Sequence, residues 1–166
     1  MLDQLAFYMG RVYYNYIGLL ERELAHVGID GTVAPGMGHT LFALYEKDDQ
    51  IIKEIAARVQ LSPSTLTGML GRMQHAGLIV RHRDRADGRS VRVKLTPLAR
   101  SLRPQCNLLV ERVDAVLEAE MDEEDVAILK SLLARVIDNI QRAGRTTGAA
   151  KRGDYEVAIR SPQLHD

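Results

Sequence analysis

The sequence predicts a mainly α-helical fold with one small β-hairpin. Apolar residues recur at helical spacing along most of the chain, and the spacing changes from about 3.6 to about 2 over residues 78–96. The 166 residues suffice for a core, and no apolar run approaches the ~20 residues that cross a bilayer. The single cysteine excludes an internal disulfide framework, and no signal-peptide pattern opens the chain. These features favour a cytoplasmic protein without a membrane partner.

Four helices are expected in the first half of the chain. The first three cover residues 2–27, 37–47 and 51–59, and "KDDQ" separates the second from the third. The fourth begins after Ser62, which is suited as an N-cap, and continues to Gly77. Pro63 stands at its first helical position, where a missing N–H costs nothing. The buried stripe of this helix comprises Leu66, Met69, Leu70 and Met73.

Two strands are expected next, over residues 78–84 and 90–96, with a turn at Asp87-Gly88. Valine and leucine alternate with Arg92 and Lys94 in the second strand, so one face packs and the other is positive. A fifth helix is expected from Pro97 to about residue 120, and a sixth up to residue 143. Residues 144–166 are expected to form a loose tail, in which "YEVAI" could form a strand against a partner.

Positive charge is concentrated in the middle of the chain. Residues 72–103 hold nine Lys and Arg against two Asp, a local balance of +7 in a chain with zero net charge. This distribution indicates a surface that binds a polyanion, and a basic surface without a partner is the alternative.

Two short helices joined by a tight turn and followed by a hairpin describe a winged helix-turn-helix. In such a fold the second helix lies in the DNA major groove, which is ~12 Å wide. Arg85 and Arg89 flank the hairpin turn and are expected to follow the phosphate backbone or to enter the minor groove. Asp87 is expected to orient Arg89 through a charge-assisted hydrogen bond. The expected DNA-binding residues are Ser62, Ser64, Thr65, Thr67, Arg72, Arg83, Arg85, Arg89 and Arg92.

Residues 52–99 contain a series of short motifs: Ile55-Ala56, Leu61-Ser62-Pro63-Ser64-Thr65, Gly77-Leu78-Ile79, the wing Asp84-Arg85-Ala86-Asp87-Gly88-Arg89 and Leu95-Thr96. In this order and spacing they resemble the MarR family of bacterial transcription regulators. The helix order extends the resemblance to about residues 1–143. Pro63 and Gly68 depart from the family pattern, so direct base readout is expected to be sparse, unless Gly68 lets the backbone approach DNA closely.

The resemblance implies a homodimer and a regulator, of repressor type, that is released from a pseudo-palindromic operator by a small ligand. Residues 1–30 and 97–143 would form intertwined dimerisation helices, and residues 36–96 the DNA-binding domain. It also suggests an effector pocket for a phenolic compound or an aromatic acid, lined by Arg11, Tyr13, Tyr16, His39 and Phe42, although an aromatic stripe at helical spacing also fits ordinary core packing.

Other functional classes have weaker support. Cys106 could make the protein an oxidant-sensing regulator, or it could be a small core residue. No metal-ligand spacing, nucleophile motif or Gly-rich phosphate loop is present, so we expect no enzyme, no metal and no cofactor. The alternative from another class is a winged-helix module for protein–protein assembly that binds no DNA.

Overall fold

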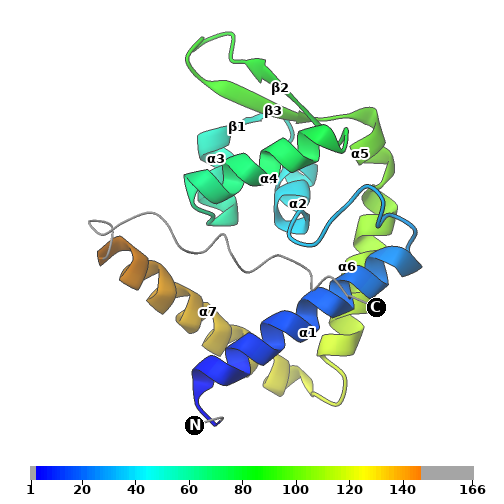
Figure 1. Cartoon of the computed structure of the whole chain (residues 1–166), viewed down its shortest axis with the longest axis vertical. Coiled ribbons are helices and arrows are strands. Elements are labelled where there is room, and N and C mark those ends of the chain that lie inside the picture. Colours follow the sequence, from blue (N-terminus) through cyan, green and yellow to red (C-terminus); the bar gives the residue numbers. More distant parts are fainter. Residues whose placement is uncertain (1–2, 147–166) are drawn as a thin grey trace, which may run out of the picture. The chain divides into compact units, whose positions relative to one another are not determined.

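The structure is a computed structural model, and it describes residues 3–146. The chain divides into two compact units, and the boundary along the sequence lies between Leu117 and Glu118. The second unit contains one described helix, α7 (Glu123–Thr146). The first unit contains α1 (Leu5–His26), α2 (Gly38–Glu46), β1 (Gln50–Ile51), α3 (Ile52–Val59), α4 (Pro63–His75), β2 (Ile79–Arg83), β3 (Val91–Leu95), α5 (Pro97–Ser101) and α6 (Arg103–Leu117) (Figure 1). The predicted fold class, mainly helical with a hairpin wing, is confirmed.

Local chemistry defines both ends of α4. The Ser62 hydroxyl accepts a hydrogen bond from the Thr65 N–H at 3.2 Å, as expected of an N-cap. At the other end Gly77 adopts a positive φ of 72°, and the Leu78 N–H donates to the Met73 carbonyl at 2.9 Å. This left-handed ending turns the chain directly from α4 into β2.

The sheet has three antiparallel strands in the order β1-β3-β2. Val93 of β3 pairs with Gln50 on one side and with Arg81 on the other. Strand β1 was not predicted, because two residues are too few to show an alternation and "KDDQ" reads as a break. The buried Gln50 side chain donates to the carbonyls of Ala43 and Lys47, so it caps α2 while its backbone extends the sheet.

A single core joins the helices to the inner face of the sheet. Its completely buried members come from α2, α3, α4, the turn before β2, β3 and α5: Leu44, Ile55, Leu66, Leu70, Met73, Leu78, Val93 and Ala99. All four predicted stripe residues of α4 are buried, so that helix presents only its opposite face to solvent.

The continuous helix expected over residues 97–120 is wrong, because the chain breaks at Leu102 between α5 and α6. Pro104 explains the break: it has no N–H to donate to the Arg100 carbonyl, and its ring crowds that carbonyl. The expected last helix runs three residues beyond 143, to Thr146. The rest of the expected tail, including "YEVAI", lies outside the described residues.

The described residues contain neither a helix suited to span a membrane nor a cluster suited to bind a metal ion. None of the helices within residues 3–146 is long and apolar enough to cross a membrane. The same residues hold no group of three or more His, Cys, Asp or Glu side chains that could bind a metal ion.

Candidate nucleic-acid interface and ligand pocket

The N-terminal end of α4 carries a short row of exposed hydroxyl groups. The Ser62 hydroxyl lies 3.1 Å from that of Ser64 and 2.8 Å from that of Thr65, and Thr67 follows on the exposed surface. Arg72 extends back along the helix, with Nη2 3.8 Å from the Met69 sulfur. Pro63 has no N–H, and the Thr65 N–H already donates to Ser62. The helix N-terminus therefore offers mainly hydroxyl groups, which suit phosphate and base-edge contacts.

The wing turn is closed by two aspartates. Oδ1 of Asp84 accepts hydrogen bonds from the N–H groups of Ala86 at 2.7 Å and Asp87 at 2.9 Å. Asp87 in turn accepts from the Arg89 N–H at 3.1 Å and from the Ser90 hydroxyl at 2.7 Å. Asp87 thus contacts Arg89 through the backbone N–H of that residue. The guanidinium itself makes no ion pair with any described residue.

The wing arginines fall into two groups. Arg83, Arg85 and Arg89 are exposed, and none of them forms an ion pair with a described residue. Arg92, also expected to bind DNA, instead lies between two carboxylates of its own chain: Nε is 3.0 Å from Asp49 Oδ1 and Nη1 is 2.6 Å from Asp84 Oδ2. Its Nη2 also donates to the Asp49 carbonyl. Arg92 therefore holds the wing in place by binding both Asp49 and Asp84.

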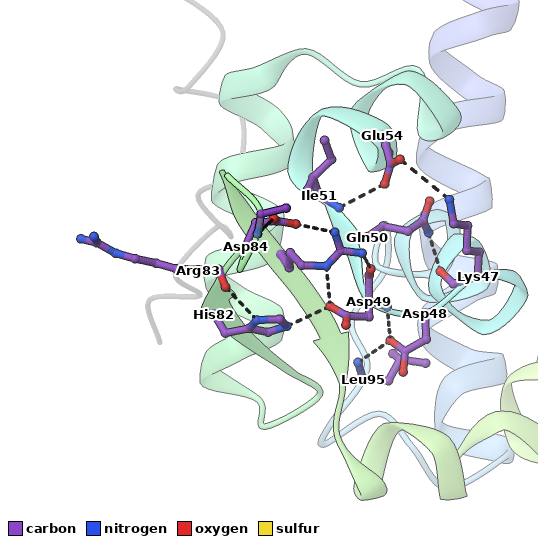
Figure 2. Close-up of polar contacts among 12 residues, drawn as sticks. Lys47, Asp48, Asp49, Gln50, Ile51, Glu54, His82, Arg83, Asp84 and Leu95 are labelled. Carbon is purple, nitrogen blue, oxygen red and sulfur yellow. Dashed lines mark hydrogen bonds and ion pairs between the residues drawn. The ribbon is translucent and has the colours of Figure 1, made fainter. Parts of the chain in front are cut away.

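We call Asp49, His82, Asp84 and Arg92 the wing clamp (Figure 2). His82 Nε2 lies 2.8 Å from Asp49 Oδ1, so Asp49 joins both long strands to the loop that precedes β1. Asp49 has a positive φ of 53°, a conformation that costs energy for a residue other than glycine. In Figure 2 the Arg83 side chain extends away from the clamp.

The clamp electrostatics follow from these contacts. Hydrogen bonds from the Asp87 N–H, then from Arg92 and the Ala86 N–H, lower the pKa of Asp84 to about 2. For Asp49, desolvation opposes ionisation, yet hydrogen bonds from Arg92 and His82 leave its pKa below the ordinary value. The pKa of Arg92 is raised by Asp84 and Asp49. The contacts of the wing clamp therefore favour the charged forms of Asp49, Asp84 and Arg92. The wing turn keeps its shape while Asp84 is charged.

An apolar pocket of about 420 Å³ lies between α1, the loop after it, α2 and α6. Four of the five residues expected to line an effector site are present: Tyr13 and Tyr16 from α1, His39 and Phe42 from α2. Arg11 is not among the lining residues, and its guanidinium lies 6.0 Å from the Tyr8 ring centroid. Asp114 of α6, which was not predicted, is part of the wall.

Cys106 lies at the base of the same pocket and is buried. Burial raises the pKa of its thiol, and Sγ is 3.7 Å from the Tyr45 hydroxyl. That hydroxyl also donates to the Ala99 carbonyl at 2.7 Å, which links α2 to α5. These surroundings are typical of a packed structural cysteine rather than of a reactive thiolate.

The fold, the exposed helix α4 and the basic hairpin define a winged helix-turn-helix protein. The model of the MarR family matches residues 35–91. The chain is 31% identical over 103 residues to the organic hydroperoxide resistance transcriptional regulator of Bacillus subtilis, across 61% of this chain and 68% of that regulator. The chain belongs to the MarR family, as its wing and helix motifs indicated.

Two further comparisons agree with this assignment. The chain is 34% identical over 106 residues to the HTH-type transcriptional regulator TtmR of Methylorubrum extorquens, across 64% of this chain and 54% of TtmR, so the match spans about half of that protein. The PcaV transcriptional regulator of Streptomyces coelicolor, solved with its natural ligand, has a TM-score of 0.74 at 21% identity, with 83% of this chain and 95% of that chain covered. These relatives are transcription regulators and not enzymes, in agreement with the prediction.

Proposed function

We propose that this protein is a sequence-specific, double-stranded-DNA-binding transcription regulator. The observation that carries the proposal is the combination of an exposed hydroxyl row on α4 with the guanidiniums of Arg85 and Arg89, which form no ion pair with a described residue, on a clamped wing. A helix of this kind fits the major groove, and arginines at the wing tip fit phosphates or the minor groove beside it. The exposed Arg83 adds charge next to the tip. Contact with chromosomal DNA would place the protein in the cytoplasm.

A homodimer is part of the proposal, because the chain leaves long apolar faces exposed. The dimerisation helices are proposed within residues 1–30 and 97–143. Large apolar side chains that remain exposed on α1, α6 and α7 include Leu5, Tyr8, Val12, Leu108, Val116, Ile128, Leu132, Ile137 and Ile140. Each of the two units, taken by itself, thus exposes many large apolar side chains, which is uncommon on a monomer. A two-fold dimer would present two copies of α4 to half-sites about one helical turn apart.

A small aromatic effector is the third part of the proposal. The pocket is mostly apolar, and aromatic rings of Tyr16 and Phe42 form part of its wall. Phe42 also meets the Tyr45 ring edge-on, with centroids 5.7 Å apart, and Tyr45 contacts the start of α5. A ligand that moves Phe42 would therefore act on the junction between the DNA-binding part and α6. Release of operator DNA, as from a repressor, is the expected response.

Fluorescence anisotropy with labelled duplexes tests the DNA-binding part. The wild type should bind DNA from upstream of its own gene more tightly than a scrambled duplex. Arg72→Ala should reduce that preference by roughly tenfold or more, since a good base contact contributes about 1–3 kcal/mol of discrimination. Arg22→Ala, an exposed arginine on α1, is the matched control and should retain the preference. Failure of the wild type to bind any duplex would leave the assembly-module alternative and reject the proposal.

A further inference from the structure

The charge inside the α1–α2–α6 pocket bears on the class of ligand that it takes. Among the described residues that line it, Asp114 is the only Asp or Glu, and none is a Lys or Arg. The remaining lining polar groups are the hydroxyls of Tyr13 and Tyr16, the His39 imidazole and the Cys106 thiol. At neutral pH the one permanent charge in this wall is therefore negative.

The cations that lie nearest along the lining helices are engaged outside the pocket. Arg112, two residues before Asp114, donates from Nε to Glu23 Oε2 at 2.6 Å. Arg103 lies 5.4 Å from the Tyr45 ring centroid, and Arg11 lies over Tyr8. None of these arginines belongs to the pocket lining. A carboxylate ligand would thus find no arginine or lysine partner among the described lining residues.

Asp114 already influences the pocket. The pKa of Tyr16 is raised, first by burial and then by the negative charge of Asp114. Asp114 itself has no hydrogen bond or ion pair with another described residue. The carboxylate is exposed, so it stands at the pocket mouth with acceptor capacity to spare. An anionic ligand would be repelled by the same charge, and a cationic one attracted.

We infer that the pocket takes a small aromatic amine in its cationic form, with the ammonium at Asp114 and the ring between Tyr16, Phe42 and Leu109. The aromatic rings of the wall also favour a cation, because their faces carry partial negative charge. This inference rests on the proposed effector pocket. It replaces the aromatic acid expected from the sequence, because Arg11, which would have paired with the carboxylate of that acid, does not line the pocket. A phenol without charge would fit the apolar wall and could donate a hydrogen bond to Asp114, but it would gain no charge–charge attraction.

Three probes of matched size separate the ligand classes: 2-phenylethylamine, 2-phenylethanol and 3-phenylpropanoate. Isothermal titration calorimetry of the full-length protein at neutral pH should give the amine at least about tenfold tighter binding than the carboxylate, with the alcohol between them. Asp114→Asn should bring the amine to the affinity of the alcohol. Glu111→Gln, which removes an exposed carboxylate one turn earlier on α6 and outside the pocket, should leave the order unchanged.

Each other outcome overturns the inference. The carboxylate could bind as tightly as the amine, the preference could survive in Asp114→Asn, or none of the probes could bind. Tight carboxylate binding that is lost in His39→Gln would assign the recognition to the imidazole. Circular dichroism and the oligomeric state of Asp114→Asn confirm that the variant folds. DNA binding is measured separately, so a protein that binds DNA but does not prefer the amine refutes this inference and leaves the proposed regulator in place.

Discussion

The Tyr45 hydroxyl forms one of the polar links between the DNA-binding helices and the segment that leads to α6. It donates to the carbonyl of Ala99, a fully buried residue of α5, at 2.7 Å. The substitution Tyr45→Phe removes this hydrogen bond and keeps the ring, which also contacts Phe42 and Arg103. Loss of such a bond costs about 0.5–1.5 kcal/mol of unfolding free energy, because a buried acceptor loses its partner.

For a chain of this size, a loss of about 1 kcal/mol lowers the melting temperature by about 2–4 °C. Differential scanning calorimetry at one fixed protein concentration measures the shift. Tyr14→Phe is the matched control, because the Tyr14 side chain is 71% exposed and its hydroxyl has no hydrogen bond with a described residue. Equal melting temperatures for Tyr45→Phe and the wild type would refute the tether between α2 and α5.

Three further predictions concern the wing and α4. Asp84 has a pKa of about 2 against an ordinary 3.8, so its ionised form stabilises the folded state. The difference in urea midpoint between wild type and Asp84→Ala should therefore be largest at about pH 5 and should shrink as the pH falls from about 4 to about 2. A difference that does not depend on pH would contradict this. Arg92→Ala should weaken DNA binding without changing its salt dependence, since Arg92 holds the wing and faces no phosphate; a lower salt slope in anisotropy titrations would assign it to DNA. Gly68→Ala should raise the unfolding free energy by up to about 1 kcal/mol in urea titrations, because the added Cβ meets only Arg72 Nη1 at 3.8 Å; a less stable variant would contradict this.

The sequence predicted α4 and the hairpin well because their signals are local. Ser62 and Gly77 mark the ends of α4 through their own chemistry, and alternation marks the strands. Strand β1 has no local signal, since Gln50 and Ile51 become a strand only by pairing with β3. The break before α6 did have a local signal, because Pro104 has no backbone N–H to donate to the preceding turn.

The residues of the candidate sites were likewise predictable only where the sequence carries a local signal. Alternation placed Arg92 on the outer face of the hairpin, yet its partner Asp49 is 43 residues away and lies in the loop before β1. The aromatic wall of the pocket was predicted from α1 and α2, whereas Asp114 was missed. It shares a helix face with Cys106 and Val110, and that spacing was the available signal.

The most direct test of the DNA interface is the salt dependence of duplex binding for the wild type and for the double variant Arg85→Ala/Arg89→Ala. If both guanidiniums of each protomer in a dimer meet DNA, the variant should bind more weakly, and the slope of log K against log salt should fall in magnitude by up to about 3–4. Arg22→Ala should keep the wild-type slope. A double variant with the wild-type slope and affinity would contradict the wing's role in DNA binding.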